Sequence, residues 1–382
     1  MTLRSVELNP QSGIPLYIQL KDWMEEQIHA GVFLPGTQAP SENELVQHIG
    51  VSRATVRQAY QKLVDSGALI KIRGRGTFVS QNGGAPLSKY GQASRLLAFL
   101  MRDAAGGVQP GLIKSVTSMA TKFGYSTIVN NSGSSLECAL ESINHFADQH
   151  ADGVLFRPLA MNPFDEVNYR ICEEIQKRNL PFVFVDIPVK DVRASVVRSD
   201  NLSGGDWIGR YLQHKGHRDV LVVTHCTNTN TDDRIAGLGK QGHLSVEILL
   251  YYQEIEGDFE RKLLRRFQSA SQPTAIFAIH DLVARRLLDF FRANQIRVPQ
   301  DISVVGFDDL EFSALLTPPL TTVHQDLEKM GNEAVRELLR VIQNPSHKAR
   351  DILIPVTFVE RESVRDLVPA IQSAEFAGKG GQ

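Results

Sequence analysis

Polar and charged side chains follow several of the short apolar runs between Leu96 and Gln325. Asp186 comes directly after PFVFV, His280 after AIFAI and Asp308 after VVGF. Carboxylates accept hydrogen bonds from neighbouring hydroxyls, and an arginine fork donates to neighbouring oxygens. A set of this kind suits a small polyhydroxylated ligand. The candidates for binding it are Asp103, Asp186, Arg198, Arg234, His280, Asp308 and Gln325.

Each candidate also has a structural alternative, because an aspartate after a strand often caps the next helix. We expect Asp281 to be such a cap, and Asp200 to cap a helix that begins near Ser203. For Arg234 the alternative is an ion pair with Asp308 that holds an empty cleft closed. Ligand binding predicts that Arg234→Ala leaves the ligand-free stability nearly unchanged, whereas the ion pair predicts a lower melting temperature.

Enzymatic chemistry has weaker support in this sequence. Asp308 and Asp309 could form a carboxylate pair for glycoside hydrolysis, but adjacent acids at a strand end point in different directions. His225 beside Cys226 could be half of a metal site, yet no partner pair has ligand spacing. No lysine motif for a Schiff base stands out either. We therefore predict no catalytic residue, no metal ligand and no cofactor.

The segment from Ser52 to Val79 is strongly basic, although the whole chain carries a formal net charge of −2. Its single acid is Asp65. Its basic residues are Arg53, Arg57, Lys62, Lys71, Arg73 and Arg75. Positive charge concentrated in one segment of a nearly neutral chain indicates nucleic acid binding.

Capping signals predict two short helices at and before this segment. Ser41 followed by Glu44 is a capping box, and Gly50 ends the first helix. Ser52 caps the second, and Gly67 closes it. The second helix has an apolar stripe at helical spacing, which consists of Val56, Ala59, Tyr60 and Leu63.

Arg53 and Arg57 lie one turn apart on the opposite face of the second helix, near its start. The N-terminal residues of a recognition helix reach base edges in the major groove, so this is where arginines are needed. A two-stranded hairpin follows at residues 70–79, with a cationic turn, GRG, at residues 74–76. Two helices and a basic hairpin are the layout of a winged helix-turn-helix.

A polar, glycine-rich stretch at residues 81–94 predicts a linker. After it, short apolar runs such as GVLF and VLVV alternate with amphipathic helices. Nearly continuous apolar strands separated by helices predict parallel sheets covered on both faces. Ligands in such folds bind at the carboxyl ends of the strands, where the candidate residues lie.

The length of 382 residues predicts two or three domains. No apolar run approaches the roughly 20 residues of a membrane helix, and the N-terminus lacks a hydrophobic signal region. Cys138, Cys172 and Cys226 are odd in number and far apart. They fit a reducing cytoplasm, and we expect all three in the core.

Residues from about Ile14 to Val79 resemble the DNA-binding domain of the GntR family of bacterial transcription regulators. The resemblance is carried by IPLYIQLKDWMEEQIHAGVFLPG, PSENEL, GVSRATVRQAYQKL and GRGTFV. It implies these DNA-facing residues: Glu42, Asn43, Ser52, Arg53, Thr55, Arg57, Arg73, Gly74, Arg75 and Gly76. Asn43 departs from the family, since many relatives carry arginine there.

Residues from about Arg95 to Val364 resemble the effector domain of LacI/GalR repressors, which is related to periplasmic sugar-binding proteins. The resemblance is carried by segments that include GVLFRP, LPFVFVDIP, DNLSGGDWIGRYLQHKGHRDV and VPQDISVVGFDDLEFSALLTPPLTTVHQDLEKMG. It implies ligand contacts at Asp186, Arg234, Asp308 and Gln325. His280, Leu238 and Arg198 depart from the family's residues, and a second arginine at 198 would suit an acidic sugar.

Together these patterns predict an α/β protein, with a winged helix-turn-helix ahead of a two-subdomain parallel α/β domain of the periplasmic-binding-protein type. We expect the DNA-binding domain at 1–80, the linker at 81–94, the effector domain at 95–365 and a disordered tail at 366–382. The expected function is a cytoplasmic, homodimeric repressor of carbohydrate-use genes. Its partners would be operator DNA and a sugar or sugar acid, and it would not bind membranes.

Two alternatives remain at this stage. One is an enzyme that acts on sugars, and the other is a sugar-binding protein without DNA function. The sequence leaves open the identity of the sugar, the operator sequence and the sign of the sugar's effect on DNA binding.

Overall fold

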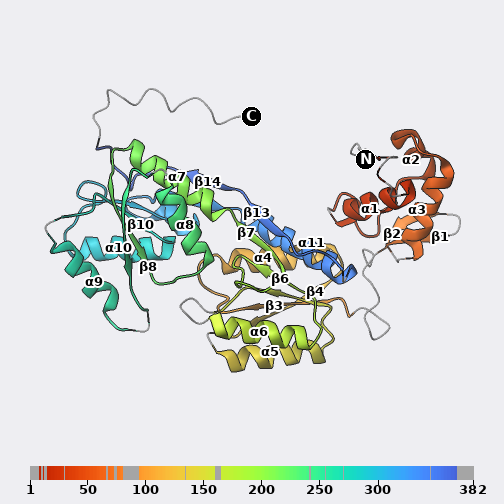
Figure 1. Ribbon diagram of the computed structural model, residues 1–382, viewed down its shortest axis with the longest axis horizontal. Helices are drawn as coiled ribbons and strands as arrows, with labels where there is room; N and C mark the ends of the chain where they lie inside the picture. Colours follow the sequence, from red (N-terminus) through yellow and green to blue (C-terminus); the bar gives the residue numbers. More distant parts are fainter. Residues whose placement is uncertain are drawn as a thin grey trace.

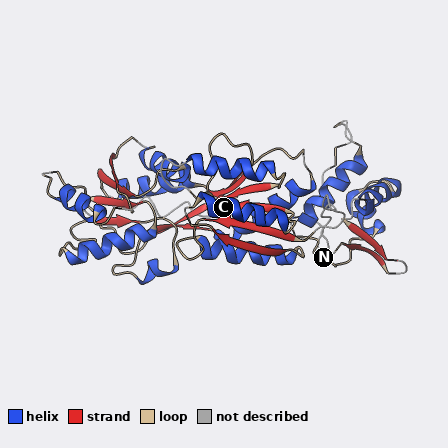
Figure 2. Cartoon of the chain, turned by 90° about the horizontal axis from the view of Figure 1, so that it is seen from below, coloured by secondary structure: helices blue, strands red, loops and turns tan. Residues whose placement is uncertain are grey.

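The fold is taken from a computed structural model, which describes residues 8–9, 12, 15–29, 31–65, 68–72, 75–80, 94–133, 135–159, 165–240, 242–253, 255–269, 271–344 and 346–367. Three parts lie in a row along the molecule (Figures 1 and 2). The N-terminal head is at one end, and two α/β lobes follow. Within the described ranges, no helix combines the length and apolar character needed to cross a membrane.

The head consists of three helices and a two-stranded hairpin. These are α1 (Leu16–His29), α2 (Glu42–Ile49), α3 (Arg53–Asp65), β1 (Leu69–Ile72) and β2 (Gly76–Val79). The expected capping box is present, since Ser41 accepts from the Glu44 N–H and Glu44 accepts from the Ser41 N–H. Gly50 ends α2 with φ 77°, a left-handed conformation that favours glycine. The apolar stripe of α3 is buried against α1, as the sequence predicts.

The first lobe is built on a six-stranded parallel sheet with the strand order β13-β7-β6-β5-β3-β4. Its strands are β3 (Leu96–Met101), β4 (Ser126–Asn131), β5 (Gly153–Phe156), β6 (Phe182–Val185), β7 (Ser195–Ser199) and β13 (Asp351–Ile354). One face is covered by α4 (Gln109–Lys122) and α11 (Leu327–Gln343), and the other by α5 (Leu136–Asp148) and α6 (Asp165–Lys177). Figure 1 shows α5 and α6 together below the sheet.

The second lobe has a four-stranded parallel sheet with the order β11-β10-β8-β9. Its strands are β8 (Asp219–Thr224), β9 (Ser245–Leu250), β10 (Ala275–Ala278) and β11 (Ser303–Val305). Its helices are α7 (Asn201–His214), α8 (Thr229–Gly239), α9 (Asp258–Phe267), α10 (Asp281–Ala293) and the 3-10 turn η1 (Glu311–Leu315). The predicted parallel sheets are therefore confirmed in both lobes.

The chain passes between the lobes at residues 199–201, 325–327 and 354–356. On the second-lobe side, β12 (Thr322–Gln325) pairs antiparallel with β14 (Val356–Val359). Strand β7 leads directly into α7, and β13 leads directly into β14. Because these crossings are short, both lobes are held beside a common hinge.

Several expectations need correction. Asp281 does not cap α10, because the imidazole of His280 accepts the capping hydrogen bond from Val283. Cys138 is exposed, whereas Cys172 and Cys226 are buried as expected. Asp200 does cap α7, and its carboxylate accepts from both the N–H and the hydroxyl of Ser203.

The structure describes only part of the linker and of the tail expected on either side of the effector domain. Residues 81–93 of the expected linker and 368–382 of the expected tail lie outside the described residues. The first residues of that tail are bound to the second lobe. Asp366 pairs with Lys215 at 3.2 Å, and the Leu367 N–H donates to the Lys215 carbonyl at 2.7 Å.

Candidate ligand pocket and nucleic-acid interface

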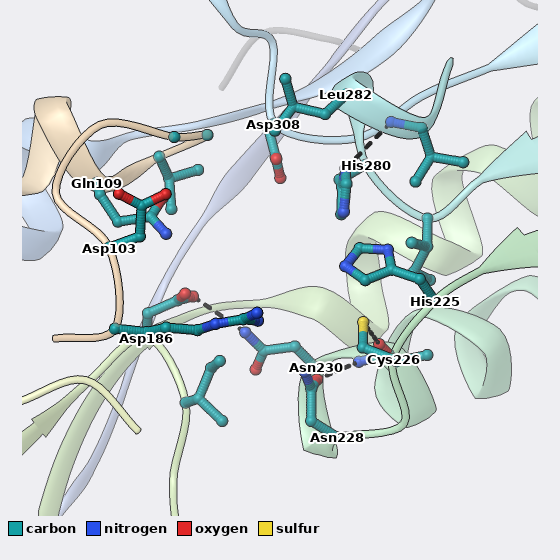
Figure 3. A pocket seen from close by; sticks show the side chains of 18 of the residues that line it. Asp103, Gln109, Asp186, His225, Cys226, Asn228, Asn230, His280, Leu282 and Asp308 are labelled. Carbon is teal, nitrogen blue, oxygen red and sulfur yellow. Dashed lines mark hydrogen bonds between the residues drawn. The ribbon is translucent and has the colours of Figure 1, made fainter. Parts of the chain in front are cut away.

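A cavity of about 350 Å³ opens between the two lobes, at the carboxyl ends of strands from both sheets (Figure 3). First-lobe residues Asp103, Arg157 and Asp186 follow β3, β5 and β6. Second-lobe residues His280 and Asp308 follow β10 and β11. The strand-end rule therefore brings most of the sequence candidates to one place.

Asp186 is the centre of the first-lobe side. It is 3% exposed, and its carboxylate forms an ion pair with Arg157 at 2.8 Å. The Asp186 backbone has φ 70°, a left-handed conformation that is unusual for a residue other than glycine. Asp103, by contrast, is exposed at the cavity, where its side chain accepts from the Ala105 N–H. The left-handed backbone of Asp186 is strained, and such strain is found at sites where the surrounding structure fixes a side chain for function.

Arg234, on α8, is held on the second-lobe side by several contacts. Its Nε donates to Asn201 at 2.8 Å, and its Nη1 donates to the Ile279 carbonyl at 2.6 Å. The guanidinium lies 3.6 Å from the centroid of the Phe307 ring, and 3.6 Å separates its Nη2 from an Asp308 oxygen. Since Arg234 and Asp308 belong to the same lobe, their pair does not close the cleft. This corrects the structural alternative considered for Arg234.

Asp308 is a buried aspartate with a raised pKa. Burial raises the pKa of Asp308 to about 8, although the positive charge of Arg234 opposes the shift. The Gln325 amide donates to Asp308 at 2.7 Å, and the Asp308 backbone has φ 115°, outside the regions that side chains favour. The raised pKa favours a protonated Asp308 carboxyl near neutral pH, and its O–H can donate a hydrogen bond to a ligand oxygen.

Two histidines form the wall beside Asp308. The His280 and His225 rings lie 4.9 Å apart in an edge-to-face arrangement. Burial, together with nearby His225 and Arg234, lowers the pKa of His280 well below its usual range, so the ring is neutral. Because His280 Nδ1 accepts from the Val283 N–H, its proton is on Nε2. His280 is therefore a hydrogen-bond donor for a neutral or anionic ligand.

One hydrogen bond joins the two lobes at the cavity. Asn230, on α8 of the second lobe, donates through Nδ2 to the Asp186 carboxylate of the first lobe at 3.0 Å (Figure 3). Both side chains are buried. The lobes are thus in contact across the site, as expected of a closed cleft.

Arg198 does not line the cavity, contrary to the sequence expectation. It lies within β7, and its guanidinium pairs with Asp233 at 2.5 Å and with Asp351 at 2.9 Å. Asp309 also points elsewhere, since its carboxylate pairs with Arg361 at 2.7 Å and lies 3.1 Å from His324. Asp308 and Asp309 therefore form no carboxylate pair at the cavity.

Sequence reasoning missed several residues of the cavity lining. They are Arg102, Gln109, Arg157, His225, Asn228, Asn230, Tyr251, Gln253 and Arg286. Arg157 directly follows a buried strand, so the rule that found Asp186 should also have found it. Asn230 lies inside a helix, and a pattern of strand ends contains no signal for it.

Glycines determine where α8 places Arg234. A Cβ on Gly205 of α7 would collide with the Arg234 carbonyl oxygen, and one on Gly237 of α8 would collide with the Leu202 carbonyl oxygen. The α7 and α8 backbones are therefore in direct contact. This contact brings Arg234 within reach of Asn201, at the start of α7.

Apart from those of the wing, the predicted DNA-facing residues of the head lie at or near the starts of α2 and α3. Asn43, Arg53 and Arg57 are exposed, and Glu42 is partly exposed. Arg57 forms an ion pair with Glu42 at 3.3 Å. Ser52 Oγ accepts from the Thr55 N–H at 3.1 Å, so Ser52 and Thr55 close the first turn of α3. The arginines therefore stand at the helix start, where a recognition helix would need them.

The wing is described only in part. Arg75 and Gly76 are exposed, whereas Arg73 and Gly74 lie outside the described residues. Gly76 has φ 113°, which L side chains rarely adopt. Ile70 and Ile72 of β1 are 45% and 38% exposed, so one face of this strand presents apolar side chains to solvent.

Two parts of the chain match known protein families. Residues 16–79 match the bacterial regulatory proteins of the gntR family. Residues 210–364 match the periplasmic binding protein-like domain.

Curated relatives match over most of the chain. An arabinose metabolism transcriptional repressor from Geobacillus stearothermophilus is 26% identical over 371 residues, which cover 94% of this chain and 100% of that repressor. The HTH-type transcriptional repressor PurR of Escherichia fergusonii is 31% identical over 265 residues, which cover 67% of this chain and 75% of PurR.

Solved structures share the fold. A LacI family transcriptional regulator from Enterococcus faecium with bound ribose has a TM-score of 0.60 and 23% identity, and it covers 72% of this chain and 100% of its own. A complex of the transcriptional regulator CelR with cellobiose has a TM-score of 0.63 and 21% identity. The match covers 85% of this chain and 100% of the CelR chain.

Proposed function

The chain belongs to the family of helix-turn-helix transcriptional repressors, with a gntR-family DNA-binding domain ahead of a periplasmic binding protein-like domain, and from this we propose that a small sugar bound between its lobes controls its affinity for operator DNA. It is thus a DNA-binding repressor that responds to a small molecule, and not an enzyme.

The observation that carries the proposal is the convergence of Asp186, Arg234 and Asp308 on one buried cavity. The cavity offers carboxyl groups, a guanidinium and the Nε2–H of His280 within a space of about 350 Å³. The buried side-chain amide oxygens of Asn230 and Gln325 have no hydrogen-bond donor in the described part of the chain. Buried polar groups are normally hydrogen-bonded, so a ligand rich in hydroxyls would satisfy this site. We propose that Asp103 also contacts it, at the cavity mouth.

A purine base is the second candidate, because some relatives are named PurR. A flat aromatic base is usually bound between aromatic or apolar faces. Among the described lining residues, Tyr251 is the one aromatic side chain besides the two histidines. It is 1% exposed and packs edge-on against Phe259 at 4.9 Å. The many polar groups and the single buried ring favour a sugar.

For the head we propose that α3 enters the major groove. Arg53 and Arg57 would then read base edges, while Glu42, Asn43, Ser52 and Thr55 would position the head on the duplex. The wing residues Arg73, Gly74, Arg75 and Gly76 would contact the backbone. The exposure of Arg53 and Arg57 on α3 supports this arrangement.

We propose that the repressor acts in the cytoplasm as a homodimer joined through residues 95–365, with 1–80 as the DNA-binding unit. A single winged helix reads only a few base pairs, and specificity in a genome calls for two linked heads. Closure of the cleft would reposition the two heads. A ligand can do this only if it prefers one of two states of the protein.

Thermal melts with a ligand panel test the sugar assignment. The panel contains arabinose, ribose, xylose, glucose, cellobiose, galacturonate and hypoxanthine. We expect at least one sugar or sugar acid to stabilise the protein, by about 2.7 kcal/mol at one hundred times its Kd. Stabilisation by hypoxanthine alone would favour the purine assignment. A panel without any stabilising member would contradict the sugar assignment.

A further inference from the structure

Arg198 joins the two lobes outside the cavity. It lies in β7 of the first lobe, and its Nη1 donates to Asp233 of α8, in the second lobe, at 2.5 Å. The Arg198 side chain is 15% exposed and that of Asp233 is 30% exposed. This ion pair is therefore partly shielded from water, and such a pair is weakened less by salt than one on an open surface.

A second acid pairs with Arg198 within the first lobe. Asp351, in β13, accepts from Arg198 Nη2 at 2.9 Å and from Nε at 3.1 Å. Strands β13 and β7 are neighbours in the first-lobe sheet, so this pair does not cross between lobes. Asp351 thus accepts from Nε and Nη2, and the remaining Nη1 donates to Asp233. Because Arg198 has one partner in each lobe, only one of its two pairs depends on the cleft being closed.

The cross-lobe partner lies next to the proposed ligand residues. Asp233 directly precedes Arg234, and Asn230 is on the same helix. Asn230 forms the other bond between lobes, to Asp186 in the cavity. Helix α8 is therefore attached to the first lobe at two points, one inside the cavity and one beside the hinge at residues 199–201.

We propose that Arg198 is a positioning residue that holds α8 against the first lobe through Asp233 and so stabilises the closed cleft before any ligand binds. Arg198 acts on the ligand through α8 and does not touch it. This role of Arg198 does not depend on which ligand fills the cavity. It also gives a role to an arginine that resemblance alone would have placed among the ligand contacts.

The apparent Kd of the ligand depends on the fraction of the protein in which the cleft is closed. If only the closed cleft binds ligand, the apparent Kd equals the intrinsic Kd divided by the closed fraction. Removing a bond that exists only in the closed state lowers that fraction. Amides that line the cleft would then exchange with solvent more often, even without ligand.

The test is hydrogen–deuterium exchange of the full chain without ligand, comparing two variants that each remove one carboxylate from Arg198. Asp233→Asn removes the partner across the lobes, and Asp351→Asn removes the partner in the same lobe. We expect amides at residues 183–190 and 226–236 to exchange about threefold to tenfold faster in Asp233→Asn. They should exchange as in the wild type in Asp351→Asn, and Asp233→Glu, which keeps the carboxylate, should restore most of the protection.

A melting temperature within experimental error of the wild type in all three variants shows that the change is local to the cleft. Equal exchange in Asp233→Asn and Asp351→Asn would overturn the proposal, because the pair would then be an ordinary ion pair. Wild-type exchange in Asp233→Asn would overturn it as well.

Discussion

Arg234 contacts protein groups on several sides: Asn201, the Ile279 carbonyl, Phe307 and Asp308. A role in ligand binding alone predicts that replacing Arg234 with alanine leaves the ligand-free stability nearly unchanged. The structure instead leads us to expect destabilisation, because Asn201 would lose its donor and hydrogen bonds to charged groups contribute about 1.5–3 kcal/mol. A lower melting temperature for Arg234→Ala is therefore compatible with both roles.

Asp308 gives a more specific prediction at the residue scale, through the pH dependence of stability. The pKa of Asp308 is raised to about 8 in the folded state, against about 3.9 in an unfolded chain. Between these values the folded state binds a proton that the unfolded state lacks. Stability from this group is complete below about pH 3.9 and is lost as the pH rises through 8.

Histidines oppose this trend at lower pH. Burial lowers the pKa of His217 to about 4 and that of His280 well below its usual range. His217 and His280 therefore raise the free energy of unfolding as the pH rises to about 6.5. The Asp308 effect is isolated between pH 6.5 and 8, where it should lower the unfolding free energy by roughly 1–2 kcal/mol. Urea denaturation across this range should show the decline in the wild type and a flatter profile in Asp308→Asn. Parallel profiles for the two proteins would contradict the raised pKa.

The arginines of α3 give the second prediction at this scale. Replacing Arg53 or Arg57 with alanine should cost about 1–3 kcal/mol at the operator, because each would lose a contact to one base. Arg75→Ala should instead weaken binding to all sequences and reduce the salt dependence of the affinity. Titrations of specific and random DNA at two salt concentrations separate these effects. Unchanged operator affinity in both α3 variants would remove α3 from the groove.

At the element scale, the contact between α7 and α8 determines where Arg234 lies. A methyl group on Gly205 would collide with the Arg234 carbonyl, which is backbone and cannot rotate away. We expect Gly205→Ala to cost about 1–3 kcal/mol of stability, and to abolish sugar binding because α8 must shift. Gly239→Ala, on α8, is the control variant, since a Cβ there has nothing within 4 Å. Thermal melts with and without sugar measure both effects, and equal behaviour of the two variants would show that the contact does not position the site.

The strand pattern predicts the positions of Asp186 and Asp308 at the cavity but not that of Arg198. Asp186 and Asp308 follow buried parallel strands, and such strands end at a common edge, so their convergence follows from the pattern alone. Arg198 also lies beside an apolar run, but β7 continues through Ser199. Arg198 is therefore within the strand, where side chains alternate between faces. Its placement depends on the strand's last residue, which the sequence does not define.

Capping shows a similar limit. Aspartate is a common N-cap and histidine is not, so the sequence favours Asp281 over His280. In the structure Asp281 is fully buried and accepts from Ser313 and Thr322, and burial raises its pKa to about 6. Those partners are more than thirty positions away, and no local pattern contains them. The capping box of α2, which is entirely local, was predicted correctly.

At the scale of the whole molecule, the head contacts the first lobe through α1 and α11. Because the lobes are joined by short hinge segments, a change in the cleft can alter how this lobe and its head are oriented in a dimer. We predict that the full chain sediments as a dimer of two 42.4 kDa subunits. Residues 95–382 alone should also be dimeric, and residues 1–80 monomeric. A monomeric 95–382 fragment with a dimeric head would place the interface in the head instead.

We predict that a sugar bound between the lobes changes the affinity of the heads for DNA. The most direct test is fluorescence anisotropy of a labelled DNA site, selected from random sequences by the protein itself, with and without the sugar that stabilises it in the melts. We predict that saturating sugar weakens DNA binding by about 5- to 150-fold, the usual range of coupling between two sites. A sugar that stabilises the protein but leaves the DNA titration unchanged would contradict this account.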